Sequence, residues 1–304
     1  MSRISLFGKT RSALQISLPS RLIINAMFTL YAIICIAPLL LVLAGSFSKE
    51  EDILTTGFTF FPRQLSLTAY RLIIGNGIEV LKAYYYSILS TVVGTVAGVT
   101  LTAALAYPIS RKDFRYRNQI AFYVYFTMLF SGGMIPTYLV YTQLIPLRNT
   151  VYALIVPGLI GAFNILLMRT FFSQNIPDAV VESAEIDGAS VYRIFFTMVI
   201  PLSKPAIATV ALFTGISYWN NFFNNMLYIT NGQIHNLPYL LYRITQQIQI
   251  INQNPELAAR LGGSLPDETA RMAMVIVSIG PIIFLYPFLQ GYFVKGLVVG
   301  AVKG

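Results

Sequence analysis

The chain has 304 residues, of which 56% are hydrophobic and only 11% are charged, with a mean hydropathy of +0.65. Soluble domains usually carry about 25% charged residues, so this composition excludes an ordinary soluble enzyme and indicates an integral membrane protein. The net charge of +9 is not gathered in a soluble module of clustered basic and aromatic residues, so it does not indicate nucleic-acid binding.

Six windows are free of charged residues, and each can supply the ~20 residues that a membrane-spanning helix needs. A charge at the centre of such a helix costs about 2.5–3.5 kcal/mol on insertion, so windows this clean predict spans. The sequence therefore predicts an all-α polytopic membrane protein with six transmembrane helices. The expected spans are roughly residues 22–47, 84–109, 119–143, 149–170, 205–229 and 272–294, within a transmembrane domain at 22–304 that follows a tail at 1–21.

The distribution of Lys and Arg predicts the orientation of these spans. Most of the basic residues fall in segments on the same side as the N-terminus, and basic residues favour the cytoplasmic side. We therefore expect a multi-pass protein of the cytoplasmic membrane, with both termini and residues 177–201 in the cytoplasm. Two long loops, residues 49–82 and 230–271, are then external. Each is expected to hold a short helix, one capped by Ser66 and one within residues 255–269.

Helix-breaking residues interrupt three of the predicted spans. They are Ser131, Gly132, Gly133 and Pro136 in the third span, Pro157 and Gly158 in the fourth, and Gly280, Pro281 and Pro287 in the sixth. Close helix packing explains such residues, because small side chains let backbones approach and kinks are tolerated. Hinges for alternating access are the alternative interpretation.

Residues 177–201 form a polar segment between two apolar spans and predict a cytoplasmic helix-turn-helix. Pro177 suits the first turn of a helix, and Asp178 complements the helix dipole. Asp178, Glu182 and Glu185 recur at i, i+4 and i+7, so one face of this helix is acidic. Taken alone, that stripe is explained by a solvated helix face.

The second half of this segment predicts a turn and another helix. Gly188 supplies the left-handed residue that ends the first helix, and Ser190 is placed to cap the second. Apolar residues follow at the helical spacing, and Pro201 is expected to end the helix. The product is a knob with one acidic and one apolar face, for which we favour a docking role.

The spacing of this knob resembles a known family pattern. The chain has Glu182, Ser183 and Ala184, then Gly188 after three residues, then Met198, Val199, Ile200 and Pro201 after nine more. This resembles the Glu-Ala-Ala loop of binding-protein-dependent ABC importer permeases, in which Glu-Ala-Ala, Gly and Ile-x-Leu-Pro occur at these intervals. The departures, at Ser183, Met198 and Ile200, are conservative in size or polarity. The resemblance covers nearly the whole chain and is closest to the second permease of maltose-type carbohydrate importers.

The resemblance implies partners and docking residues. The coupling helix of the family sits in a cleft of a cytoplasmic ATPase. The docking residues expected here are Asp178, Glu182, Ser183, Ala184, Glu185, Asp187, Gly188, Ile200 and Pro201. The implied partners are a homologous second permease, two ABC ATPase subunits, an extracytoplasmic solute-binding protein and a sugar or oligosaccharide. ATP and Mg²⁺ would bind to the ATPases, so this chain is expected to bind no cofactor. The C-terminal tail, residues 295–304, would either reach the ATPases or anchor at the membrane surface.

The end of the fifth span carries a cluster of amide and aromatic side chains. The candidate residues for a translocation path are Tyr218, Trp219, Asn220, Asn221, Asn224 and Asn225. Bare amides in hydrocarbon cost several kcal/mol, so they must be solvated or bonded. A wet path for a hydroxyl-rich solute and a set of interhelical hydrogen bonds with interfacial anchors are both consistent with this cluster. In related sugar permeases this helix lines the path.

Residues for catalysis or metal binding are sparse. His235 is the only histidine and Cys35 the only cysteine, so no catalytic triad or metal cluster is expected. We therefore expect a transport subunit without a nucleotide site. A permease for a non-sugar solute is the nearest alternative. A secondary carrier or channel is a weaker one, because neither inverted repeats nor intramembrane charges are visible.

Overall fold

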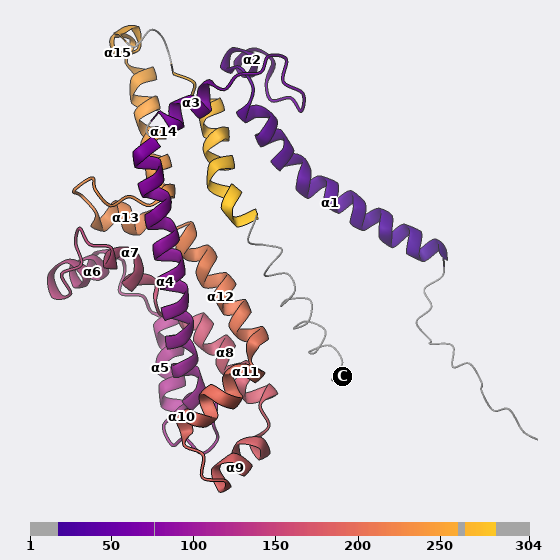
Figure 1. Ribbon diagram of the computed structural model, residues 1–304, viewed down its shortest axis with the longest axis vertical. Coiled ribbons are helices and arrows are strands. Elements are labelled where there is room, and N and C mark those ends of the chain that lie inside the picture. Colours follow the sequence, from indigo (N-terminus) through magenta and orange to yellow (C-terminus); the bar gives the residue numbers. More distant parts are fainter. Residues whose placement is uncertain (1–17, 76, 261–264, 284–304) are drawn as a thin grey trace, which may run out of the picture.

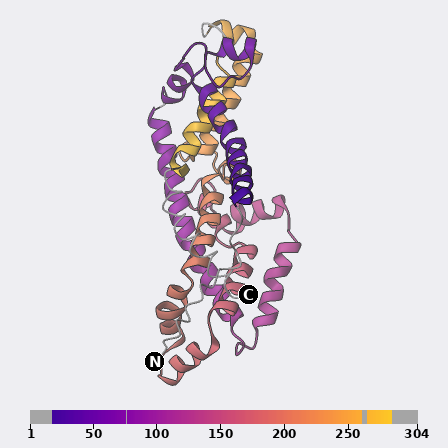
Figure 2. The ribbon, with the colours of Figure 1, turned by 90° about the vertical axis from the view of Figure 1, so that its right-hand side faces the viewer.

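The computed structural model describes residues 18–75, 77–260 and 265–283, and these residues form an elongated bundle of helices (Figures 1 and 2). In chain order the first elements are α1 (Leu18–Ser46), α2 (Glu50–Thr56), α3 (Thr68–Ile74), α4 (Gly77–Ser110), α5 (Arg117–Leu129), α6 (Met134–Leu139), the π-helix η1 (Val140–Leu144), α7 (Tyr152–Ile155), the 3₁₀-helix η2 (Val156–Gly158) and α8 (Ala162–Asn175). Then follow α9 (Asp178–Ile186), α10 (Val191–Ile194), the π-helix η3 (Phe195–Val199), α11 (Ile200–Leu202), α12 (Lys204–Trp219), α13 (Phe223–Tyr228), α14 (Leu237–Gln253) and α15 (Pro255–Arg260). Residues 268–283 form a last helix, called helix 268–283 below.

The described helices include two that are long and apolar enough to cross a membrane, α1 and α4. Three bent pairs also pass that test: α5 with α6–η1, bent by 111°, α7–η2 with α8, bent by 52°, and α10–α11 with α12, bent by 80°. The described residues thus supply up to five spans if each bent pair is one. The sixth predicted span, 272–294, begins in helix 268–283 and ends outside the described residues, so the count of six stays a prediction.

The two ends of the bundle carry different segments. The knob of α9–α11 lies at one end of the long axis, and α2, α3 and α15 lie at the opposite end (Figure 1). α4 runs the length of the bundle and packs mainly against α8 and α12. Small residues allow this close packing: a Cβ added to Gly94 would lie 2.5 Å from ring atoms of Tyr218. α1 stands apart from the other helices, with none of its apolar window buried (Figure 1).

The predicted helix breaks are confirmed in two of the three spans. The third span breaks before α6, where Gly133 has a φ of 86°, and the fourth breaks between η2 and α8. The prediction for the sixth span is wrong within the described residues, because helix 268–283 continues through Gly280 and Pro281. Pro281 has no N–H for the carbonyl of Val277, four residues earlier, and the Tyr84 hydroxyl donates to that carbonyl at 2.8 Å instead.

The fifth predicted span, 205–229, is not one continuous helix. α12 ends at Trp219, and α13 starts at Phe223. The Oδ1 atom of Asn221 accepts a hydrogen bond from the backbone N–H of Asn224 at 3.0 Å. At this break a side-chain oxygen therefore replaces the backbone carbonyl that would accept from this N–H in a continuous helix. This competition is the reason that Asn is disfavoured inside helices.

Sequence reasoning missed α14, a 17-residue helix in a segment that was treated as an amide-rich loop. Its signal was present. Asn236 caps the helix by accepting from the N–H of Tyr239, and apolar side chains then recur at the helical spacing. The buried residues on this face are Leu237, Leu240, Leu241, Ile244 and Ile248. The predicted short helices are confirmed as α3 and α15, but Leu67 rather than Ser66 is the N-cap residue of α3. The Oγ of Ser66 accepts from the N–H of Thr68 at 3.2 Å, one residue before the cap.

Candidate functional site

The predicted helix-turn-helix is confirmed at residues 178–202. α9 ends at Ile186, and Gly188, directly after the C-cap residue Asp187, has a φ of 76°, the left-handed conformation expected there. The Oγ of Ser190 accepts a hydrogen bond from the N–H of Arg193 at 3.3 Å and so caps α10. Pro177 precedes the first helical residue of α9 rather than lying within its first turn.

The expectation that Pro201 ends the second helix is wrong. The helix continues through Pro201 to Leu202 and turns by 80° into α12 at Ser203. A π-helical stretch, η3, lies directly before this proline. Prolines and π-bulges are both common sites of kinks in helices. Here the π-helical turn of η3 directly precedes the turn that contains Pro201, the residue that lacks an N–H.

Apolar residues of the knob hold it against the bundle. Val181 and Ala184 on α9 and Ile194 on α10 are buried. They belong to one apolar cluster with Tyr107 of α4 and Phe172 of α8. The knob is therefore a packed part of the fold, and its orientation is set by α4 and α8.

The exposed residues of the knob combine carboxylates with large apolar side chains, and two of them, Glu185 and Tyr192, line the pocket between the knob and α4. Glu182, Glu185 and Asp187 are exposed, and none of them forms an ion pair with another described residue. Ile186 is 86% exposed and Tyr192 is 78% exposed. Of the other predicted docking residues, Ser183 and Pro201 are exposed, Ile200 is partly buried and Ala184 is buried. Large exposed apolar side chains together with unpaired carboxylates favour an interaction surface here.

Asp178 differs from the other acidic residues of the knob. Its Oδ2 lies 2.8 Å from the Nζ of Lys112, and its Oδ1 lies 3.4 Å from a guanidinium nitrogen of Arg111. The hydrogen bond from Lys112, together with the charges of Lys112 and Arg111, holds the pKa of Asp178 below its usual value. Sequence reasoning missed both basic partners, although their position directly after the second span was a signal. We call these three residues the Asp178 clamp.

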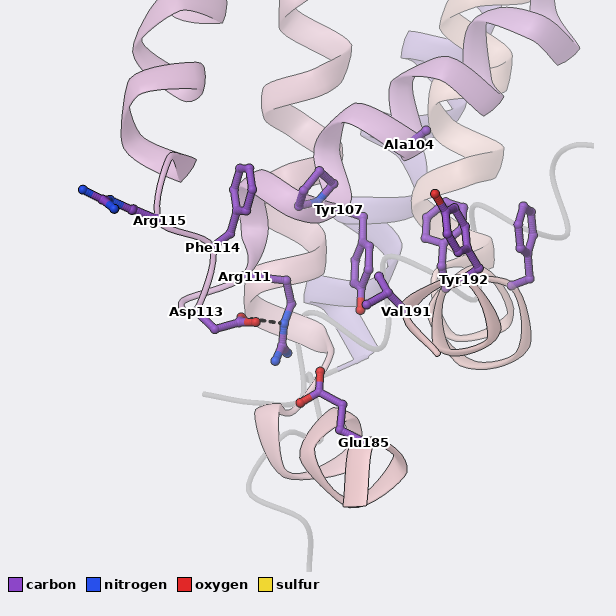
Figure 3. Close-up of a pocket in the computed structure, with 12 residues that line it drawn as sticks. Ala104, Tyr107, Arg111, Asp113, Phe114, Arg115, Glu185, Val191 and Tyr192 are labelled. Carbon is purple, nitrogen blue, oxygen red and sulfur yellow. Dashed lines mark hydrogen bonds and ion pairs between the residues drawn. The ribbon is translucent and has the colours of Figure 1, made fainter. Parts of the chain in front are cut away.

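A pocket of about 470 Å³ lies between the end of α4 and the knob (Figure 3). Tyr107 and Phe195 form part of its apolar wall, and Tyr192 lies at the α10 side. Arg111 points down toward Glu185 of α9 and bonds to Asp113 at 3.2 Å (Figure 3). The pocket therefore lies between the knob and the end of α4, beside the buried cluster that joins them.

The aromatic residues proposed for a translocation path point into the protein. Tyr218 is 3% exposed, and its hydroxyl donates to the carbonyl of Ile155 at 2.6 Å. Trp219 is 5% exposed, and its Nε1 donates to the carbonyl of Ser278 at 3.1 Å. Tyr218 therefore joins α12 to α7, and Trp219 joins α12 to helix 268–283.

The four asparagines divide between structural and exposed positions. Asn225 is fully buried: its Nδ2 donates to the carbonyl of Ile234 at 3.1 Å, and its Oδ1 contacts the Nδ1 of His235 at 3.2 Å. Asn221 receives hydrogen bonds from the N–H of Asn224 and, at its carbonyl, from the side chain of Asn236. Asn220 is exposed, and its side chain has no hydrogen bond to another described residue. The cluster is not brought together as one polar face.

Within the described residues, no group of three His, Cys, Asp or Glu side chains is arranged to hold a metal ion. The knob instead offers a shaped surface, rigid on its inner side and mixed in polarity on its outer side. Such a surface can bind a protein partner and transmit its motion to α4 and α12.

The comparisons with known proteins agree with this geometry. The model of the family "binding-protein-dependent transport system inner membrane component" matches residues 94–299. The polygalacturonan/rhamnogalacturonan transport system permease protein YtcP of Bacillus subtilis is 40% identical over 93% of this chain and 98% of its own. The trehalose/maltose transport system permease protein MalG of Thermococcus litoralis is 28% identical over 93% of this chain and 96% of its own.

A solved structure is also similar over most of the chain. It is a chain of a bacterial ABC transporter involved in the import of the acidic polysaccharide alginate. The two chains are 32% identical, with a TM-score of 0.74 that covers 91% of this chain and 99% of the other. This chain therefore belongs to the family of inner membrane components of binding-protein-dependent transport systems, as an ABC transporter permease.

Proposed function

We propose that this chain is one of two homologous permeases in an ATP-driven importer of oligosaccharides. Two ATPase subunits would bind its cytoplasmic end, and an extracytoplasmic binding protein would deliver the solute to the outer end. The names of the relatives support a sugar: the B. subtilis relative is a polygalacturonan/rhamnogalacturonan permease, and the solved neighbour belongs to an alginate importer. A permease for a non-sugar solute is the alternative.

The observation that carries this proposal is the mixed polarity of the knob's exposed residues. The knob has unpaired carboxylates at Glu182, Glu185 and Asp187 and exposed apolar side chains at Ile186 and Tyr192. A partner with basic groups at the rim of an apolar cleft would complement these residues. Because ATP and Mg²⁺ would bind to that partner, hydrolysis would take place outside this chain.

The mechanism follows from the way in which the knob is held. When the ATPases close on ATP, they would move α9 and α10 together, since Val181, Ala184 and Ile194 are packed in the same cluster as α4 and α8. α4 and α12 would then rock relative to the partner permease and switch the path from outward-open to inward-open. This is alternating access driven from the cytoplasmic end.

Affinity purification from the native membrane tests the proposal. The tagged chain should co-elute with a second permease and an ATP-binding subunit. The variant Glu182→Lys should lose the ATPase, whereas Glu51→Lys, an exposed change at the opposite end, should retain it. Recovery of the chain alone, active in liposomes without ATP, would instead establish a carrier or channel.

Gly188 provides a second test, directed at coupling. A Cβ at Gly188 meets no atom within 4 Å, so a substitution there acts through the φ of 76° alone. Gly188→Val should strain the turn and uncouple ATP hydrolysis from transport, whereas Gly188→Asn should remain coupled, because Asn tolerates the left-handed region. Normal solute-stimulated ATPase activity in Gly188→Val contradicts the role of the turn.

A further inference from the structure

A second pocket, of about 590 Å³, lies toward the opposite end of the bundle from the knob. Its volume is within the range of about 300–1,000 Å³ that is typical of small-molecule sites. The first part of α4 and the segment between α13 and α14 line it. The polar and aromatic residues of this lining are Glu79, Lys82, Tyr85, Tyr86, Gln233 and His235.

The charged and amide side chains of this pocket have no ion-pair or hydrogen-bond partner among the described residues, although the charge of Glu79 acts on His235. Glu79 and Lys82 form no ion pair or side-chain hydrogen bond with any described residue, although they lie three residues apart on α4. The side chain of Gln233 likewise makes no hydrogen bond to a described residue. Tyr85 is 61% exposed and lies in edge-to-face contact with the ring of Tyr86. Groups of both charges, an amide and an aromatic face are therefore available to a ligand.

One wall of the pocket is fixed by internal hydrogen bonds. Asn225 donates through Nδ2 to the carbonyl of Ile234, which turns its Oδ1 toward the Nδ1 of His235. His235 must then donate from Nδ1 to that oxygen, which leaves Nε2 as an acceptor. This Nε2 is buried and has no partner among the described residues. The wall that carries it is preorganised because Asn225 is fully buried.

We propose that this pocket is an outer saccharide-contact site, which takes a sugar ring that bears a carboxylate. The exposed ring of Tyr85 would pack against the apolar C–H face of the sugar, while Glu79 and Gln233 bind its hydroxyls. Lys82 would bind the carboxylate through a charge-assisted hydrogen bond. The inference rests on the proposed import function and names the chemical class of its solute.

Lys82 indicates that the ligand carries a negative charge. Neutral sugars are bound well by carboxylate and amide groups alone, whereas an unpaired ammonium beside them provides a partner for an anion. The similarity to a chain of an importer of the acidic polysaccharide alginate supports the same class of solute. The site lies on this permease, so it would hold the solute after the binding protein releases it.

The test is direct binding to the assembled transporter in nanodiscs, without the binding protein. A short oligogalacturonate and a neutral maltooligosaccharide of equal length are titrated by calorimetry. Lys82→Gln should weaken binding of the oligogalacturonate about tenfold or more while binding of the neutral sugar changes little. Tyr85→Ala should weaken both. Arg63→Gln, the same charge change at an exposed external residue outside the pocket, should have no effect.

The outcomes separate this inference from the proposed function. Equal losses in Lys82→Gln and Arg63→Gln, or no binding by the wild-type transporter, would overturn the saccharide site. If Lys82→Gln and Tyr85→Ala bind the saccharides normally but have a weakened affinity for the binding protein, the saccharide site is overturned too. The pocket would then be a protein-docking surface. In each case the ATPase would still co-purify. Failure to recover the ATPase would contradict the proposed function instead.

Discussion

Asn149 is the only described residue other than glycine with a positive φ, at 59°. Its Oδ1 accepts hydrogen bonds from the backbone N–H groups of Thr230, at 2.6 Å, and Asn231, at 3.2 Å. Its own N–H donates to the carbonyl of Tyr228 at 3.0 Å. One residue therefore joins the loop before α7 to the turn after α13, and it must do so in a conformation that few side chains tolerate.

We expect Asn149→Ala to destabilise the protein by about 1–3 kcal/mol, because it loses the side-chain hydrogen bonds and forces Ala into the left-handed region. Asn149→Gly should cost less, because glycine removes only the hydrogen bonds. Thermal unfolding of the purified protein in detergent measures both. Equal loss in the two variants would show that the backbone conformation contributes nothing.

Gly94 and Tyr218 make a steric pair that can be separated by mutation. Gly94→Ala should be destabilising by about 1–3 kcal/mol, since its Cβ would lie 2.5 Å from the Tyr218 ring. The effect should shrink in a Tyr218→Leu background, where the ring is absent. Gly215→Ala is the matched control on α12, because its Cβ would meet only the Thr95 Oγ1 at 3.4 Å. Thermal unfolding measures the stability of each variant. If the losses of stability in Gly94→Ala and Tyr218→Leu are additive in the double variant, the two residues do not form a steric pair.

At this scale the sequence predicted conformations better than contacts. Gly188 and Ser190 take the roles that their residue types dictate, since a left-handed turn and a cap are local properties. Tyr218 and Trp219, by contrast, were candidates for a path and point inward. Their partners, the carbonyls of Ile155 and Ser278, lie about sixty residues away in the chain, and no local pattern reveals which distant carbonyl a side chain will reach.

Among the elements, α9 is joined to α4 through the Asp178 clamp. We expect Asp178→Asn to lower the number of solute molecules transported per ATP while the ATPase stays bound. The exchange Asp178→Lys with Lys112→Asp should restore part of the coupling, because the pair is re-formed with reversed charges. Glu256→Gln, at an exposed carboxylate of α15 that forms no ion pair with a described residue, is the control. Reconstituted transport and ATPase assays measure the ratio, and unchanged coupling in Asp178→Asn would contradict the role of the clamp.

The clamp also has a predicted pH dependence. The pKa of Asp178 is lowered in the folded protein, so the stabilisation is present above the unfolded value of about 3.9 and is lost as pH falls through the folded value. The difference in thermal stability between wild type and Asp178→Asn should therefore stay constant from neutral pH to about pH 5 and shrink below about pH 4. A difference that disappears near neutral pH would mean that another group is responsible.

The elements were predictable where breakers or caps are strong. The break before α6 follows from adjacent glycines, whereas the continuation of helix 268–283 through Pro281 does not, because it depends on Tyr84 of another helix. α14 was missed although its spacing is helical, because its many amide residues suggested a loop. The knob was predicted in position, but its end at Leu202 was not, because a π-helical stretch has no simple sequence signal.

For the whole molecule, the two ends should face opposite sides of the membrane. In a Cys35→Ala background, Asp187→Cys in the knob should react with a membrane-impermeant maleimide only after the cells are permeabilised. Glu51→Cys in α2, exposed at the opposite end, should react in intact cells. Labelling of Asp187→Cys in intact cells would reverse the orientation predicted from the Lys and Arg distribution.

Pro281 distinguishes one position along helix 268–283, because it leaves the carbonyl of Val277 without its usual helical hydrogen-bond donor. Sliding helix 268–283 by one residue shifts it by about 1.5 Å and rotates it by about 100°, which would carry the freed carbonyl of Val277 away from Tyr84. The neighbouring carbonyl of Ser278 is held by Trp219 in the same way. These two hydrogen bonds, one of them to the carbonyl left without a partner by Pro281, together fix the rotation of helix 268–283 relative to α4 and α12. A transport cycle that preserves these bonds must move α4, α12 and helix 268–283 together as one rigid body. The conformational change must then take place in other parts of the chain.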